Sequence, residues 1–239
     1  IGTEVAKEAS DIVLLDDNFA SIVSAAEEGR SIYKTVKKVL TFLFSTSMGE
    51  VINIMGALIL RWPIPLLPSQ IIWLNFITDG FLTAALAMEP KEKGLMQGKF
   101  ERPKKWIVDG FMARRMLMMA PVMGLGTLYL FSQYFEADLA KGWTIALTTM
   151  AVFQWFNAWN CRSESKSIFQ MNPFSNMFLV GATMVVIFLQ LFAVYNPFMQ
   201  KFLHTTPLEL SEWVIIISIA ASIILVEETR KFFYRRKSV

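Results

Sequence analysis

The chain has 239 residues, of which 54% are hydrophobic and 18% are charged, and its net charge is +3. This charge content is low for a soluble domain, and the charged residues fall in blocks between long apolar runs. The composition therefore excludes an ordinary soluble domain and favours a multi-pass membrane protein. We expect a lipid bilayer as its surroundings and no nucleic-acid partner. Cys161 is the only cysteine, so no intrachain disulfide can form.

Residues 1–18 have the character of a soluble segment. The apolar run at residues 12–15 has a strand-like composition, and the turn-forming residues Asp16, Asp17 and Asn18 follow it. One strand cannot form a core alone. We therefore expect residues 1–18 to be the end of a cytosolic α/β domain whose other strands lie outside this chain. Since the first residue is Ile rather than Met, we expect the chain to derive from a longer protein.

A long helix is predicted to follow. From Phe19 to Lys38, apolar residues recur at helical spacing opposite charged ones, and residues 39–60 are apolar on all sides. The pattern predicts one helix of about 40 residues, about 60 Å long at 1.5 Å per residue. Residues 19–38 would form a cytosolic stalk, and the rest would enter the membrane. The alternative is two helices separated near Gly29.

Five further membrane spans are predicted, at residues 69–88, 111–131, 142–160, 176–195 and 213–226, the last being the shortest. The expected fold is an all-α bundle of six transmembrane helices over residues 39–239. Basic residues are concentrated in the stalk and in segments 89–110, 162–166 and 230–237, and are sparse in the intervening loops. This one-sided distribution predicts that both termini are cytoplasmic.

Two carboxylates occur inside predicted spans. Glu50 is near the middle of the first span and Asp79 near the middle of the second. An unpaired carboxylate at this depth costs several kcal/mol, about 3 on insertion scales. We expect no basic residue inside any span, so the missing partner would be a bound cation or protons.

Neutral oxygen-bearing side chains accompany Asp79. Asn75, Thr78 and Asp79 are spaced i, i+3 and i+4, so they share one helix face. Asn75 and Thr78 are candidate cation ligands, although hydrogen bonding to neighbouring helices would explain them equally well. Gly80 follows directly, and a glycine in a spanning helix can loosen the backbone so that carbonyl groups face a ligand.

Further polar residues accompany Glu50. Ser47 and Asn53 lie three residues before and after it on the same face. Gln154, in the fourth span, is deep enough to offer a carbonyl oxygen to an ion. Asn157 and Asn160 are nearer the cytosolic end, where we expect them to form hydrogen bonds between helices.

The donor atoms favour a hard cation. Calcium takes 6–8 oxygen ligands, and the candidate side chains together offer about five to seven oxygens with two negative charges; these side chains are Glu50, Asn75, Thr78, Asp79 and Gln154. No His or Cys accompanies them, which disfavours a soft transition metal. Calcium is the favoured ion, with sodium and manganese as open alternatives. Two carboxylates balance one divalent ion better than two.

Several segments resemble a known family. Residues 2–23 and the EEGRSIY segment at 27–33 resemble the end of the phosphorylation domain and the stalk of P-type cation-transporting ATPases. SMGEV at 47–51 and WLNFITDG at 73–80 are similar to the fifth and sixth membrane helices of the calcium pumps in that family. The resemblance implies that this chain is the C-terminal six-helix membrane part of such a pump.

The resemblance also implies roles for individual residues. In the calcium pump of the sarcoplasmic reticulum, the positions matching Glu50, Asn75, Thr78 and Asp79 bind transported calcium. Ser47 and Gln154 stand where that pump has an Asn and a Glu ligand, and plasma-membrane calcium pumps resemble the glutamine choice. We include both residues in the expected metal site. Because Ser47 and Gln154 differ from the ligands of that pump, we expect the two-ion site to differ at these two positions.

The parts of the family that hydrolyse ATP are not in this sequence. The phosphorylated DKTGT motif, the nucleotide-binding and actuator domains and the first four membrane helices lie outside it. ATP and Mg²⁺ would therefore act only in the full-length protein, as the missing N-terminal part supplies their sites. The alternatives are an ATP-independent cation channel or secondary transporter, and a purely structural membrane subunit.

Overall fold

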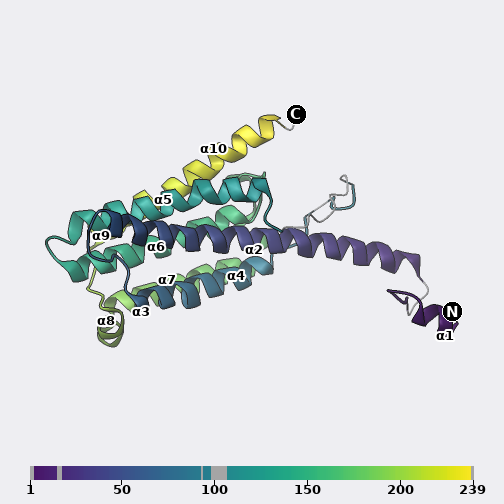
Figure 1. Ribbon diagram of the computed structural model, residues 1–239, viewed down its shortest axis with the longest axis horizontal. Coiled ribbons are helices and arrows are strands. Elements are labelled where there is room, and N and C mark those ends of the chain that lie inside the picture. The colour runs from purple at the N-terminus through teal and green to yellow at the C-terminus, as the bar shows by residue number, and fades with distance from the viewer. Residues whose placement is uncertain (1–2, 15–17, 93, 98–106, 238–239) are drawn as a thin grey trace.

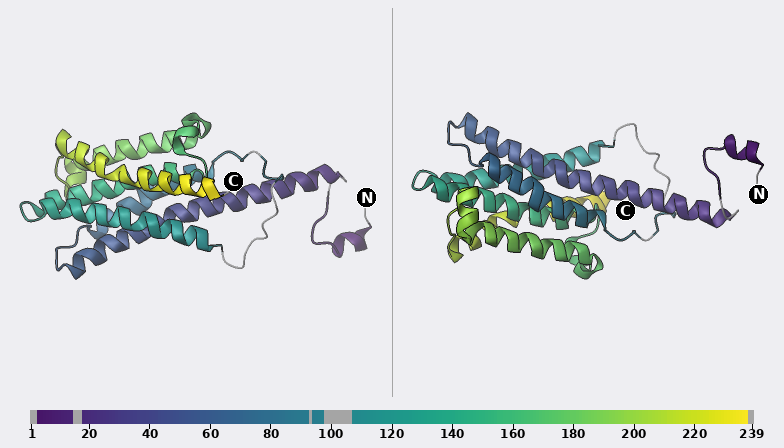
Figure 2. Two further views of the ribbon diagram at one scale, coloured as in Figure 1. Left: turned by 90° about the horizontal axis from the view of Figure 1, so that it is seen from above. Right: turned by 90° about the horizontal axis from the view of Figure 1, so that it is seen from below.

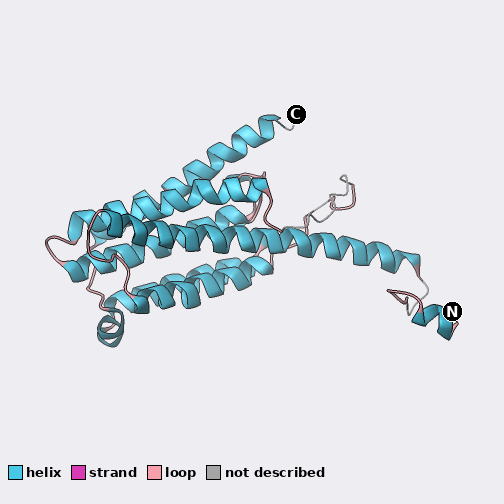
Figure 3. Ribbon diagram, in the orientation of Figure 1, coloured by secondary structure: helices cyan, strands magenta, loops and turns pink. Residues whose placement is uncertain are grey.

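The computed structural model describes residues 3–14, 18–92, 94–97 and 107–237, and these contain helices and no strand (Figure 3). The helices are α1 (Glu4–Glu8), α2 (Phe19–Ile59), α3 (Pro68–Trp73), a π-helical segment (Leu74–Asp79), α4 (Gly80–Ala87), α5 (Gly110–Tyr134), α6 (Leu139–Cys161), α7 (Met177–Tyr195), α8 (Pro197–Leu203), α9 (Leu210–Ala220) and α10 (Ser222–Lys237). Short 3₁₀ turns lie at Ile168–Gln170 and Pro173–Ser175. The predicted all-α fold class is confirmed.

Helix α2 is continuous over 41 residues, so the predicted single long helix is confirmed and no break occurs at Gly29. Asn18 caps its start by accepting a hydrogen bond from the backbone N–H of Ala20. In Figure 1, α2 runs through the bundle and projects beyond it toward the N-terminus. We call the N-terminal part of α2, residues 19–38, the stalk, and we call the end of the bundle on this side the stalk end.

The strand expected at residues 12–15 is not seen. Ile12, Val13 and Leu14 lack regular structure, Ile12 is 82% exposed, and Leu15 to Asp17 lie outside the described residues. The physical reason is the lack of a partner, because a strand needs a neighbour to satisfy its backbone hydrogen bonds. Assignment of residues 1–18 to the end of an α/β domain stays a prediction.

Five helical segments are long and apolar enough to cross a membrane: α2, Pro68–Ala87, α5, α7 and Leu210–Arg236. The remaining predicted span corresponds to α6, which has 23 residues but more polar side chains. Most residues of α6 are buried, because it lies at the centre of the bundle and packs against α2, α5, α7 and α9. A helix surrounded by protein need not be uniformly apolar to be buried. The count of six spans stays a prediction.

The last predicted span, residues 213–226, is longer in the structure than expected. Helix α9 ends at Ala220, and α10 continues from Ser222 past Glu227 and Glu228 to Lys237. The two carboxylates do not end the helix, because both are paired with basic side chains inside the protein. The C-terminal end of α10 and the stalk extend from the same end of the bundle (Figure 2).

The connection between α4 and α5 docks on the stalk through ion pairs. Glu92 lies 3.0 Å from Lys34 Nζ and 2.8 Å from Lys38 Nζ, and Lys37 Nζ lies 2.6 Å from Asp109 Oδ2. Partial burial of Glu92 disfavours its charged form, but hydrogen bonds and attraction from Lys38 and Lys34 outweigh this effect and lower the pKa of Glu92. The ion pairs therefore fix the stalk against this connection.

Two further contacts extend the docking. Arg30 donates a hydrogen bond to the carbonyl of Leu95 at 2.9 Å, and Lys91 pairs with Glu28. The other basic residues predicted in this connection, Lys93, Lys99, Arg102, Lys104 and Lys105, lie outside the described residues.

Candidate cation site

Glu50 lies at the centre of the bundle and is 6% exposed. Helix α2 places it there because its buried positions recur every three to four residues, from Thr41 to Ala57. Its carboxylate accepts hydrogen bonds from two amides on other helices. Asn75 Nδ2 lies 3.2 Å from Glu50 Oε2, and Gln154 Nε2 lies 3.3 Å from Glu50 Oε1. The structure thus brings together three of the predicted site residues from three helical segments.

Asp79 ends the π-helical segment Leu74–Asp79 and is 2% exposed. Its Oδ2 lies 3.0 Å from Thr46 Oγ1, while its Oδ1 has no hydrogen-bond partner in the described part of the chain. The Thr46 hydroxyl also lies 2.8 Å from the carbonyl of Leu43, so its single hydrogen is shared between two acceptors. Asp79 is consequently less well satisfied than Glu50.

The π-helical geometry occurs immediately before Gly80. Single π-helical turns within longer helices are rare and are frequently found at functional sites. The segment spans Asn75, Thr78 and Asp79, so all three candidate ligands lie on widened backbone. The sequence predicted that Gly80 would loosen the helix backbone. In the structure the π-helical turn lies directly before Gly80.

Thr78 and Ser47 occupy different environments. Thr78 is 2% exposed and lies beside Asp79, whereas Ser47 is exposed on the outer side of α2. Ser47 takes no part in the hydrogen bonds around Glu50 and Asp79. Its spacing and the family resemblance placed Ser47 with Glu50, but the buried face of α2 follows positions 45, 46, 49, 50 and 53. The roles of Thr78 and Ser47 as ligands stay predictions.

Thr46 is the residue that sequence reasoning missed. It lies four residues before Glu50, a spacing that puts both side chains on one face of α2, but nothing in the sequence connected Thr46 with Asp79. The contact depends on how α2 packs against the segment that ends at Asp79, 33 residues later. We call Glu50, Asp79, Thr46, Asn75 and Gln154 the carboxylate site.

Neutral groups surround both carboxylates of this site. Within the described ranges, no three His, Cys, Asp or Glu side chains gather where a metal ion could be held. A cation here would therefore depend on amide and hydroxyl oxygens in addition to the two carboxylates. Such hard oxygens suit calcium, sodium or manganese better than a soft metal.

The predicted interhelical hydrogen bonds of α6 are confirmed. Asn157 Nδ2 donates to Ser45 Oγ at 2.8 Å, and Asn160 Nδ2 donates to the carbonyl of Ile223 at 3.2 Å. Together with Gln154, these bonds position α6 against α2 on one side and α10 on the other.

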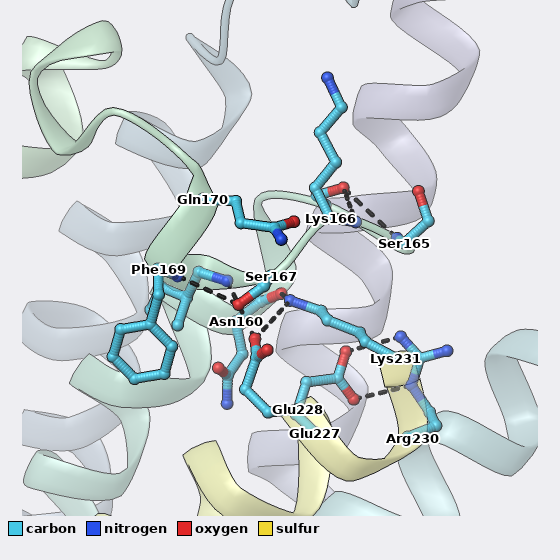
Figure 4. Close-up of polar contacts among 12 residues, drawn as sticks. Asn160, Ser165, Lys166, Ser167, Phe169, Gln170, Glu227, Glu228, Arg230 and Lys231 are labelled. Atoms are coloured by element: carbon cyan, nitrogen blue, oxygen red, sulfur yellow. Dashed lines mark hydrogen bonds and ion pairs between the residues drawn. The ribbon is translucent and has the colours of Figure 1, made fainter. Parts of the chain in front are cut away.

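A group of buried charges lies at the stalk end and differs from the carboxylate site. Arg115 Nη2 lies 2.7 Å from Glu227 Oε1, and each of these side chains is 1% exposed. Arg230 donates to both oxygens of Glu227 at 2.8 Å, and Lys231 donates to the carbonyl of Asn160 (Figure 4). The expectation that no basic residue lies inside a span is wrong, since Arg115 belongs to α5. It pairs with Glu227 rather than with the mid-bundle carboxylates.

The same end holds a second buried ion pair. Arg162, at the end of α6, binds both carboxylate oxygens of Glu89 with donor–acceptor distances of 2.9–3.1 Å. Arg162 Nη2 also donates to Ser175 Oγ at 2.6 Å, and Asn176 Nδ2 donates to Glu89 Oε2 at 2.7 Å. Sequence reasoning assigned the basic residues of segments 162–166 and 230–237 to membrane orientation, but several also hold helices and loops together.

Comparison with known proteins identifies the family. Residues 63–233 match the family described as cation transporting ATPase, C-terminus. The chain belongs to the P-type cation-transporting ATPases. The predicted membership of this family is thereby confirmed, and this part of the ATPase is an integral, multi-pass membrane protein.

Three of the proteins that are similar to this chain are named calcium-transporting ATPases. The chain is 37% identical over 223 residues to one from Bacillus subtilis (strain 168), which covers 92% of this chain and 25% of that protein. It is 34% identical over 241 residues to calcium-transporting ATPase 1 of Saccharomyces cerevisiae, a match that covers 100% of this chain and 25% of that protein. It is 31% identical over 281 residues to a calcium-transporting ATPase from Plasmodium falciparum, a match that covers 99% of this chain and 23% of that protein. The chain thus spans about a quarter of the length of these ATPases.

Proposed function

We propose that this chain is the ion-binding membrane domain of an ATP-driven pump that transports calcium. Glu50 and Asp79 are the central ligands, with Asn75, Thr78 and Gln154 adding neutral oxygens and Ser47 at the edge. The observation that carries the proposal is the pairing of two buried carboxylates with neutral donors alone. Because their negative charge has no fixed counter-charge, a mobile cation is the partner that makes their burial tolerable.

Calcium is proposed on two grounds. The oxygen count and the two negative charges suit one calcium ion, and the relatives reported above are named as calcium-transporting. In this proposal the full-length protein supplies phosphorylation by ATP and Mg²⁺ through its N-terminal part, and both termini of this chain face the cytoplasm.

The stalk supplies the mechanical link. It is continuous with the part of α2 that carries Glu50, and its basic residues are held by the connection between α4 and α5. A shift of the stalk moves Glu50 and, through that connection, the segment that ends at Asp79. Calcium ligands must lie at 2.3–2.6 Å, so a small shift changes affinity. Release of the ion leaves Glu50 as the carboxylate that takes up a proton.

The test uses the protein made from the complete reading frame. We expect phosphorylation of the parent protein by ATP to depend on calcium. In Glu50→Gln and in Asp79→Asn we expect the calcium concentration needed for phosphorylation to rise at least about 100-fold, since each variant removes a charge that calcium would neutralise. Glu209→Gln, at the exposed residue that caps the start of α9, is the matched control and is expected to behave like the parent.

Two outcomes would contradict the proposal. If both site variants kept the parent's calcium dependence, the carboxylate site would not bind the transported ion. If calcium crossed vesicle membranes at the same rate without ATP, a channel or secondary transporter would be the correct function.

A further inference from the structure

Asn53 is a buried amide with no partner. Its side chain is 0% exposed, and neither Nδ2 nor Oδ1 has a hydrogen-bond partner in the described residues. It lies one turn beyond Glu50 on the buried face of α2. Buried polar groups are almost always paired, so an amide with two unpaired atoms demands an explanation.

A second unpaired group lies at the same height on α5. Thr127 is also 0% exposed, and its Oγ1 has no partner among the described residues. Two close approaches between α2 and α5 fix which residues lie at the same level along the two helices. A Cβ atom at Gly124 would lie 2.8 Å from the Gly49 carbonyl oxygen, and a Cβ atom at Gly56 would lie 2.6 Å from Leu128 Cδ2. Asn53 falls between Gly49 and Gly56, and Thr127 falls between Gly124 and Leu128.

The third unpaired atom belongs to the carboxylate site itself. Gln154 uses Nε2 to bind Glu50, but its carbonyl oxygen Oε1 has no partner in the part of the chain described here, and its side chain is 0% exposed. Helices α2 and α6 run in opposite directions, since Asn157 meets Ser45 and Gln154 meets Glu50. The surface between α2 and α6 therefore continues from Glu50 toward Asn53.

Protein added outside this chain cannot satisfy these groups. Each side chain has no accessible surface within the chain alone, so a further helix packed on the outside would not reach them. A small enclosed species, either a water molecule or an ion, could do so. The unpaired atoms include two amide carbonyl oxygens and a hydroxyl oxygen, and a carboxylate lies beside them. These are ligands of a hard cation.

We propose that Asn53, Thr127 and Gln154 Oε1 form a neutral-oxygen subsite for calcium next to Glu50. When the ion binds, Asn53 Oδ1 and Gln154 Oε1 would coordinate it, and Asn53 Nδ2 would turn to donate a hydrogen bond to Thr127 Oγ1 that is not formed in the structure. The inference rests on the proposed function, because Glu50 supplies the charge that draws the ion. It adds a ligand, Asn53, and a positioning residue, Thr127.

The experiment separates a ligand from a packing residue by measuring two quantities in the full-length protein. The first is ⁴⁵Ca²⁺ binding against buffered free calcium, and the second is the midpoint of thermal unfolding without calcium. For Asn53→Leu we expect calcium affinity to fall about tenfold while the midpoint stays the same or rises, because a buried unpaired amide is removed. Asn53→Asp restores the oxygen and is expected to bind calcium at least as tightly as the parent.

Asn176→Leu is the matched control. Asn176 is 2% exposed, but its amide donates to the Ala85 carbonyl and to Glu89. We expect its replacement to lower the unfolding midpoint and to leave calcium affinity unchanged, the reverse of the Asn53→Leu pattern. Thr127→Val, which keeps the shape and removes the hydroxyl, is expected to weaken binding two- to threefold.

The inference is overturned if Asn53→Leu binds calcium like the parent, or if its affinity and its unfolding midpoint fall together. Glu50→Gln and Asp79→Asn are measured in parallel. If they lose calcium binding while Asn53→Leu keeps it, only the subsite is wrong. If they too bind like the parent, the proposed function fails with it.

Discussion

The carboxylates at mid-bundle and those at the stalk end are buried to a similar degree but have different partners. Glu50 and Asp79 are 6% and 2% exposed and contact amides and a hydroxyl. Glu227 and Glu89 are equally enclosed and contact arginines. A buried acid paired with arginine is part of the architecture, whereas a buried acid among neutral donors has no fixed counter-charge, and in the proposed function a mobile cation supplies it.

The largest effect on stability is expected at the arginine-paired end. Glu227→Gln leaves Arg115 buried without its counter-charge and should lower the free energy of unfolding by about 3–5 kcal/mol. Glu50→Gln removes an uncompensated charge and should not lower it. Denaturant unfolding of the detergent-solubilised protein without calcium measures both free energies. Equal losses in the two variants would contradict the distinction between carboxylates paired with arginine and carboxylates among neutral groups.

A smaller loss is expected for Arg162→Lys. Lysine keeps the charge beside Glu89 but cannot reproduce the two-pronged contact or the bond to Ser175. We expect a loss of about 1.5–3 kcal/mol, the range for hydrogen bonds to charged groups. Unfolding measured as above tests this, with Arg236→Lys, on the exposed side of α10, as a control. A loss below that of the control would indicate that charge alone holds this end together.

Ser45→Ala probes a neutral contact between these two regions. It removes the acceptor of Asn157 Nδ2 and leaves a buried donor on α6 unpaired. We expect a loss of about 1 kcal/mol in the free energy of unfolding. The exposed neighbour variant Ser47→Ala should have no effect on stability, and a similar loss there would contradict the burial difference between the two serines.

The smallest effect is expected at the surface, where Glu92 joins the stalk. Because its folded-state pKa is lowered, its contribution is fully present above its ordinary value of 4.5 and is lost as the pH falls through the lower, folded value. Glu92 is partly exposed, so we expect less than about 1 kcal/mol. The difference in unfolding free energy between the parent and Glu92→Gln should therefore shrink as the pH falls below about 4.5. A difference that stays constant with pH would show that these ion pairs of Glu92 do not stabilise the folded protein.

The sequence predicted much of the carboxylate site because membrane burial is easily recognised in a sequence. Long apolar runs marked the helices, and Glu50 and Asp79 stood out within them. The i, i+3, i+4 spacing placed Asn75 with Asp79 but could not decide that the Asn75 amide binds Glu50 on another helix. Thr46 escaped notice for the same reason, since its contact depends on helix packing.

The sequence by itself predicted a long helix over α2, the apolar helices that follow it and the two acids within apolar runs. Local periodicity and hydropathy carry that information. Tertiary structure alone decided which acids have arginine partners, that Ser47 points outward while Asn53 points inward, and that the strand-like segment at residues 12–14 remains irregular. Each of these depends on side chains from distant segments, and no local pattern records which surfaces of the helices will face one another.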